Sequence, residues 1–123
     1  MRIDIEGDRM MTASLRDRAG RRPWLRLLGS VLQLAGEHAE LLRHTERPWA
    51  SVTFSGARHT VLLTFNGVEA MNAADDFIAS LPEYEFSIQG QLVADATITS
   101  VEQESLPQPK ITVEAELLLL ENI

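Results

Sequence analysis

Residues 23–44 read PWLRLLGSVLQLAGEHAELLRH, and this stretch carries the strongest periodic pattern in the chain. Six apolar residues recur at spacings of three and four, which places them on one face of a helix: Leu25, Leu28, Leu32, Ala35, Ala39 and Leu42. Pro23 suits the first helical position, where its missing N–H has no intrahelical partner. Pro48 cannot continue a helix. We therefore predict a long helix over residues 23–44.

A second apolar stripe lies beside the first on this predicted helix, formed by Leu27, Val31, Leu34, His38 and Leu41. A helix with two apolar stripes must be buried on two sides. One sheet covers a single side, so the helix either lies between two layers of this chain or is shared with a second subunit, and we favour a second copy of the chain. The residues that we expect at such an interface are Leu27, Val31, Leu34, Leu118 and Leu120.

Alternating apolar residues downstream predict antiparallel strands. The first pair is Trp49–Ser55 and Thr60–Phe65, joined at 56–58; the second is Leu92–Gln103 and Lys110–Glu121, joined at 105–109. A shorter helix, at about 69–81, lies between the pairs, and Tyr84–Gln89 is a further candidate strand. Keeping the apolar faces of the second pair together sets Ile98 opposite Ala115 and Thr99 opposite Glu114. Leu117 to Leu120 is apolar on both faces, so we expect both to be covered.

These elements predict one α+β domain over residues 1–123. We expect an antiparallel sheet of four or five strands with both helices on one face, in the order α-β-β-α-β-β, with one further strand possible. The alternative is a strongly curved, cone-like sheet of the cystatin-like or nuclear-transport-factor-like kind. Pro48 and Pro82, like Gly56 and Gly90, recur 34 residues apart, which leaves open a duplicated α-β-β half.

Charge is distributed unevenly along the chain, which has a net charge of −7. Residues 1–26 hold seven arginines against four acids, whereas residues 59–123 hold one lysine against eleven acids. Nucleic-acid binding needs clustered cations, and most of this chain would repel phosphate. We expect no nucleic-acid partner. Instead, we expect the basic N-terminal segment, residues 1–22, to pack on the acidic part of this chain or of a neighbouring subunit.

Cysteine is absent, which excludes disulfides, thiolate zinc sites and thiol chemistry. Arg21-Arg22 followed by an apolar run resembles a twin-arginine export signal, but Gln33 interrupts the run. No stretch reaches the ~18 apolar residues that a membrane span requires. We therefore expect a cytoplasmic protein with no membrane partner. Ten arginines against one lysine favour a GC-rich bacterial genome.

Motifs for catalysis are absent: the chain has no HExxH, no GxSxG and no glycine-rich phosphate loop. We predict no catalytic residue, no metal site and no cofactor. His38 and His44 fall on the predicted long helix, where a lone histidine is usually structural. His59 lies beside a predicted hairpin turn and is the best candidate for ligand contact, together with Trp49 and Arg58.

Three functions fit this pattern. The first is a non-enzymatic, self-associating interaction or structural module, most simply a homodimer, with a further protein partner possible. The second is a small-ligand-binding protein or an enzyme without a known motif, with a pocket near His59. The third is a small acidic secretion-type chaperone, which this chain resembles in size and charge alone.

Overall fold

The structure is a computed structural model and describes residues 23–121. Its elements are α2 (Pro23–Ala35), β1 (Ala39–Ala50), β2 (Ser55–Asn66), α3 (Val68–Ser80), the 3-10 helix η2 (Leu81–Glu83), β3 (Gln91–Glu104) and β4 (Lys110–Glu121). The strands form one antiparallel sheet in the order β1-β2-β4-β3. The predicted α+β class and element order are confirmed. The predicted basic segment, residues 1–22, lies outside the described residues.

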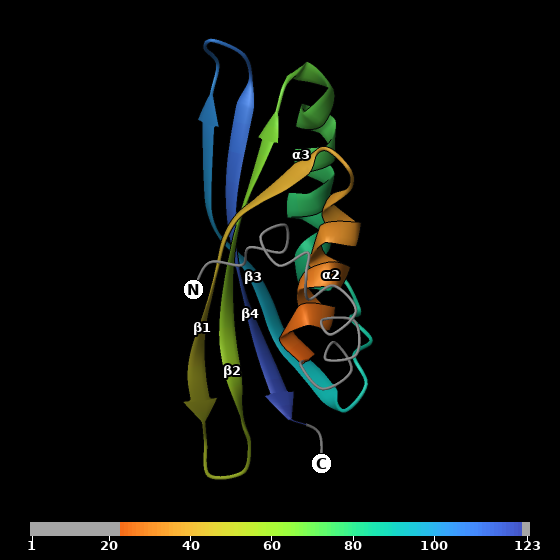
Figure 1. Cartoon of the computed structure of the whole chain (residues 1–123), viewed down its shortest axis with the longest axis vertical. Helices are drawn as coiled ribbons and strands as arrows, with labels where there is room; N and C mark the ends of the chain where they lie inside the picture. Colours follow the sequence, from red (N-terminus) through yellow and green to blue (C-terminus); the bar gives the residue numbers. More distant parts are fainter. Residues whose placement is uncertain (1–22, 122–123) are drawn as a thin grey trace, which may run out of the picture.

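Both helices lie on the same face of the sheet (Figure 1). The inward residues of the two central strands alternate along the chain and are all buried against the helices: Val61, Leu63, Phe65, Ile111, Val113, Ala115, Leu117 and Leu119. Phe77 of α3 meets Phe65 of β2 with ring centroids 6.0 Å apart. Strand alternation on one side and helical spacing on the other therefore produce one apolar core.

The predicted helix over 23–44 is wrong in its second half. Helix α2 ends at Ala35, and residues 39–50 form strand β1. Gly36 follows the helix with φ of 90°, and its N–H donates to the Leu32 carbonyl at 3.0 Å, which closes the last turn. The helical spacing continued through Ala39 and Leu42 because a strand also supplies apolar residues at intervals that a helix can match.

Shortening α2 also changes what its two apolar stripes contact. Leu27 and Val31 of one stripe and Leu28 and Ala35 of the other are all buried in the chain's own core. Leu34 is partly buried against the same core. The wide apolar face of α2 is thus covered within the single chain, so Leu27 and Val31 are out of reach of a second copy.

The first hairpin turns earlier than predicted. Its turn is 51–54, and Gly56–Arg58 belongs to β2 rather than to a turn. The Ser51 hydroxyl accepts hydrogen bonds from the Phe54 N–H at 3.0 Å and the Thr53 N–H at 3.3 Å, which stabilises the turn. Gly56 is needed for a different reason, because a Cβ there would meet the Leu119 carbonyl and lie 2.8 Å from the Leu120 Cα.

The register of the second hairpin is confirmed at Ile98, which lies opposite Ala115. The next predicted pair is shifted: Ser100, not Thr99, lies opposite Glu114, because a bulge follows Ile98. Thr99 still donates to the Glu114 carboxylate at 2.8 Å. All four residues from Leu117 to Leu120 are buried, as predicted, but only Leu117 and Leu119 belong to the core under the helices. The predicted strand at Tyr84–Gln89 is irregular, apart from a single bridge between Ile88 and Gln91.

Two glycine substitutions test this packing. We expect Gly56→Ala to lower the free energy of unfolding by about 1–3 kcal/mol, because the added methyl group overlaps the backbone of β4. Gly29→Ala in α2 is the matched control, since no atom lies within 4 Å of its added Cβ. It should raise the free energy by up to ~1 kcal/mol through helix propensity. Urea denaturation of both variants measures the difference, and equal effects would contradict the β2–β4 register.

Candidate functional site

Two histidines that are far apart in sequence meet on the helix-facing side of the sheet. His44 on β1 and His59 on β2 are each 1% exposed, and His44 Nε2 lies 2.8 Å from His59 Nδ1. The two ring planes differ by 15° with centroids 5.1 Å apart. That separation fits two imidazoles joined edge to edge by a hydrogen bond, so the rings lie side by side in nearly one plane.

Trp24, in the first turn of α2, lies over His44, which is on edge strand β1. Its ring is nearly parallel to that of His44, with centroids 5.4 Å apart, in the range of an offset stack. His44 Nδ1 is buried and has no hydrogen-bond partner among the described residues. Since one of the two facing nitrogens must carry the shared proton, the pair is a fixed donor–acceptor unit with one nitrogen left unsatisfied.

Burial keeps this pair neutral. Loss of hydration lowers the pKa of His44 to about 4, with a further lowering by the neighbouring His59 and a partial opposing effect of Glu46. Loss of hydration likewise lowers the pKa of His59 to about 4. Both imidazoles are therefore uncharged near neutral pH and offer lone pairs and N–H groups rather than positive charge.

A cleft of about 160 Å³ opens beside His59, where the sheet extends past the start of α2. It is lined by Trp24, Glu46, Gly56, Ala57, His59, Gln91, Leu119 and Glu121. Glu46 lies directly across from His59 in the β1–β2 register. Within residues 23–121, no three His, Asp or Glu side chains are arranged to hold a metal ion.

The three residues predicted to form one ligand site do not come together. His59 faces the helices, whereas alternation along the strands directs Arg58 and Trp49 to the other face. Sequence reasoning missed His44, because it assigned this residue to the end of a helix. Glycine commonly follows the last residue of a helix, so Gly36 was the sequence signal that the helix ends there.

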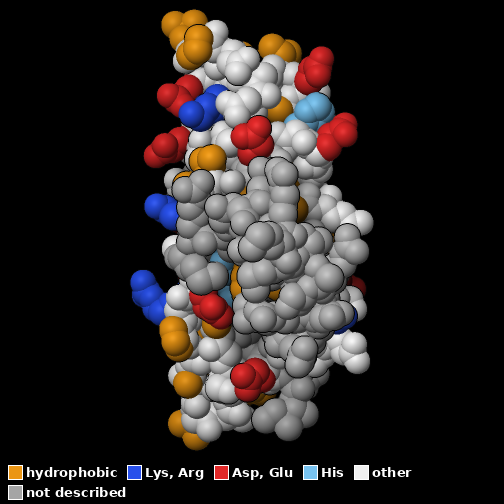
Figure 2. Space-filling view, in the orientation of Figure 1, with side chains coloured by type: hydrophobic (Ala, Val, Ile, Leu, Met, Phe, Trp, Pro, Cys, Tyr) orange, Lys and Arg blue, Asp and Glu red, His pale blue; other side chains and the backbone are white. Residues whose placement is uncertain are grey.

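The other face of the sheet, turned away from α2 and α3, is here called the open face. Its outward residues on β1 and β2 form a basic half, with three arginines against one glutamate: Arg43, Arg47, Arg58 and Glu40. Those on β4 and β3 form an acidic half, with five carboxylates against one lysine: Asp95, Glu102, Glu104, Glu114, Glu116 and Lys110. Basic side chains project from the left margin in Figure 2, beside β1.

The two halves meet at an ion pair in the middle of the open face. Arg58 donates to the Glu116 carboxylate at 2.8 Å, and both side chains remain about one-third exposed, at 34% and 33%. A hollow of about 290 Å³ lies around this pair, lined by Thr45, Glu46, Arg47, Arg58, Thr60 and Glu116. Leu118 and Leu120, which were predicted at an interface, also point to this face but are only 9% and 6% exposed. Their neighbours Trp49 and Leu92 are more exposed and contribute more of the apolar surface of this face.

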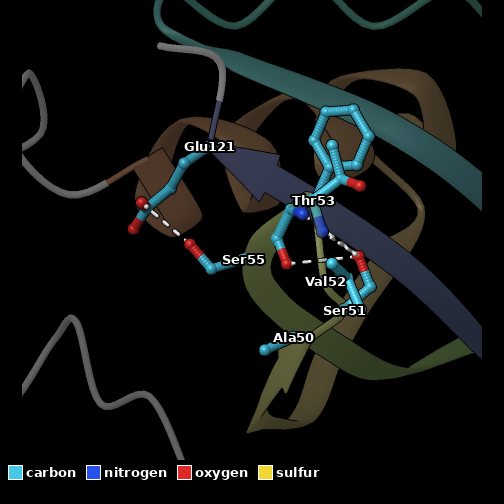
Figure 3. A pocket seen from close by; sticks show the side chains of 7 residues that line it. Ala50, Ser51, Val52, Thr53, Ser55 and Glu121 are labelled. Carbon is cyan, nitrogen blue, oxygen red and sulfur yellow. Dashed lines mark hydrogen bonds between the residues drawn. The ribbon is translucent and has the colours of Figure 1, made fainter.

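The turn between β1 and β2 forms a further hollow, of about 380 Å³, lined by residues 50–55 and Glu121. Figure 3 shows that the hydrogen bonds of Ser51 lie within the turn, and that beside it Ser55 of β2 is hydrogen-bonded to Glu121 of β4. Val52 is fully exposed and Phe54 about half exposed. Hydrophobic side chains accordingly gather at the lower tip of the molecule in Figure 2.

No family model, curated protein or solved structure matches this chain. The described helices include none with the length and apolar character needed to cross a membrane. The His44–His59 pair, its cleft and the open face are therefore the features of the molecule from which a function is inferred.

The neutral histidine pair predicts a specific pH dependence of stability. The unfolded histidines have pKa values near 6.5, whereas burial lowers the folded ones to about 4. Between these values the unfolded chain binds more protons, so the free energy of unfolding falls as the pH drops from 6.5 to 4. Above pH 6.5, these two residues contribute no pH dependence.

The double substitution His44→Phe/His59→Phe keeps two planar rings and removes both titrating groups. We expect a flatter dependence of the urea midpoint on pH between 6.5 and 4 than in the unsubstituted chain. Replacing both partners together avoids leaving a single buried imidazole without its hydrogen bond. Identical slopes for the two proteins would contradict the assignment of neutral, buried histidines.

Proposed function

We propose that this protein is a self-associating interaction module that pairs through its open face with the open face of a second copy. The observation that carries the proposal is the division of that face into a basic half on β1 and β2 and an acidic half on β4 and β3. When two such faces meet about a two-fold axis, each basic half can lie against the partner's acidic half.

The edges of the sheet are poor alternatives for association. Edge strand β1 carries a bulge between Leu41 and Arg43 and a proline, Pro48, that cannot donate to an added strand. Edge strand β3 carries two bulges, after Val93 and after Ile98, together with exposed acids. Bulges, prolines and charges are the usual features that prevent edge-to-edge pairing. The open face is therefore favoured over the edges.

The size of the open face suits a dimer. Strands of 12 to 14 residues are about 40 Å long, and four strands are about 19 Å wide. The flat area is thus roughly 750 Å², close to the ~800 Å² per partner in a standard protein–protein interface. Two-sheet packing of this kind, with strands nearly aligned, is a common arrangement.

Apolar and polar groups on this face are arranged as in non-obligate interfaces. Leu42, Leu62, Trp49 and Leu92 supply exposed or half-buried apolar surface between the charges. The hollow around Arg58 and Glu116 can receive side chains from the partner. An apolar patch surrounded by charged residues is the composition expected of an interface that forms between folded chains.

Charge reversal tests the proposal. Variant X, Arg43→Glu/Arg47→Glu, makes both halves of the open face acidic. Variant Y, Asp95→Lys/Glu102→Lys/Glu104→Lys, makes both halves basic. We expect each variant alone to weaken self-association at least tenfold, about the effect of a few like charges placed opposite one another. An equimolar mixture of X and Y should form a heterodimer, because both contacting pairs of halves are again of opposite sign.

Sedimentation velocity at tens of micromolar measures the association of the unsubstituted chain, X, Y, the mixture of X and Y, and a control variant. Glu69→Lys/Asp75→Lys/Asp76→Lys is the matched control, since it changes net charge as Y does but on exposed residues of α3. It should self-associate like the unsubstituted chain. A strictly monomeric unsubstituted chain would overturn the proposal. Unchanged association of X and Y, or no recovery on mixing them, would show that another surface is used.

A further inference from the structure

The outward residues of the open face form rows that run across the four strands. Strand pairing sets one row as Arg47, Arg58, Leu118 and Asp95, from β1 to β3. This row begins with two arginines on the first hairpin and ends with a carboxylate on the second. Within one chain, Arg47 and Asp95 are three strand spacings apart, about 14 Å, which is too far for direct pairing.

The charge of Arg47 is not compensated within the described part of the chain. Arg47 lies directly opposite Arg58, where like charges repel each other. Glu116 pairs with Arg58 at 2.8 Å, whereas no described carboxylate lies within 4 Å of Arg47. Both arginines line the hollow of about 290 Å³. Glu46 also borders this hollow, but strand alternation turns its side chain toward the helix-facing side. The hollow therefore has room for a further carboxylate beside Arg47.

The charge division of the open face selects the direction of the two-fold axis. Sheets that pack face to face keep their strands nearly aligned, so an axis in the plane between the two faces is either parallel or perpendicular to the strands. A perpendicular axis lays β1 on the partner's β1 and sets basic half against basic half. A parallel axis between β2 and β4 lays β1 on the partner's β3, and each row then faces its own copy.

We propose that the dimer axis runs parallel to the strands between β2 and β4, and that the partner's Asp95 occupies the hollow beside Arg47 and Arg58. This inference rests on the proposed self-association. In the adjoining row, the same axis sets Trp49 against the partner's Leu92, which is half exposed, so two apolar side chains meet. Because the axis is two-fold, each contact occurs twice. The hollow is thus complete only in the dimer.

One row opposes this arrangement. It places Glu40 opposite the partner's Glu102, and both are exposed. Successive rows along β1 contain Arg47, Thr45, Arg43 and Glu40. Rows on one face are ~7 Å apart, so the two glutamates meet about 20 Å from the Arg47 contact. They lie at the end of the face, where water and salt screen exposed charges, so their repulsion is weaker than the attraction in the hollow.

A charge exchange within one chain tests the contact in the hollow. Arg47→Asp and Asp95→Arg should each weaken self-association at least ~10-fold, because each sets like charges against one another twice in the dimer. The double variant Arg47→Asp/Asp95→Arg should recover association to within about threefold of the unsubstituted chain, since the two positions again carry opposite charges. Sedimentation velocity over a dilution series gives the dissociation constants, and urea midpoints check that each variant is folded.

Arg43→Asp/Asp95→Arg is the matched control. It has the same composition as the other double variant, but the axis sets Arg43 opposite the partner's Ser100. It should remain at least ~10-fold weaker than the unsubstituted chain. Equal dissociation constants for the two double variants, with the unsubstituted chain dimeric, would overturn the axis and the Asp95 contact but leave self-association in place. A monomeric unsubstituted chain would overturn self-association and this contact with it.

The absence of cysteine allows a direct measurement of the axis. Thr45 and Thr97 are outward residues at the two ends of one row. Chains with Thr45→Cys and chains with Thr97→Cys are mixed and treated with a bismaleimide that spans ~10 Å, the separation of packed sheets. A parallel axis gives cross-links between the two kinds of chain. Cross-links only between chains of the same kind, or none in a dimeric sample, would overturn the proposal.

Discussion

The two central strands, β2 and β4, bury one face against α2 and α3, and this contact organises the rest of the molecule. Every inward residue from Val61 to Phe65 and from Ile111 to Leu119 lies in the resulting core. Because both helices are on one side, the core has a single layer of helices, and the second face of the sheet must be explained by its own chemistry. That face is charged, and its charges are sorted by strand pair.

The histidine pair is buried on the same side of the sheet as the core, where α2 begins and Trp24 stacks on His44. At this end the strands extend past α2, so the inward positions of β1 and β2 hold His44 and His59 rather than aliphatic residues. Buried imidazoles that hydrogen-bond to each other tolerate such a position better than isolated polar groups. The cleft beside them follows from the same geometry, since Trp24 closes one side and the ends of β3 and β4 another.

The charge division of the open face has its origin in chain order. Each hairpin forms one side of the sheet, so β1 and β2 lie together, as do β3 and β4. The first hairpin carries three of the arginines, and the second contains most of the outward acids. A difference in charge between two parts of the sequence thus becomes a difference in charge between the two halves of one surface. In the proposed dimer, this division would favour the single orientation in which halves of opposite charge face each other.

By itself, the sequence determined the α+β class, the order of elements, the Ile98–Ala115 register and the burial of Leu117–Leu120, because period-2 and period-3.6 apolar patterns specify which residues share a face. It did not determine where α2 ends, since residues 39–44 match a helical spacing while forming a strand. Only the tertiary structure brought His44 to His59, separated Arg58 and Trp49 from them, and covered Leu27 and Val31 within the chain. Those contacts depend on strand pairing between distant residues, and one change of element at Gly36 alters all of them.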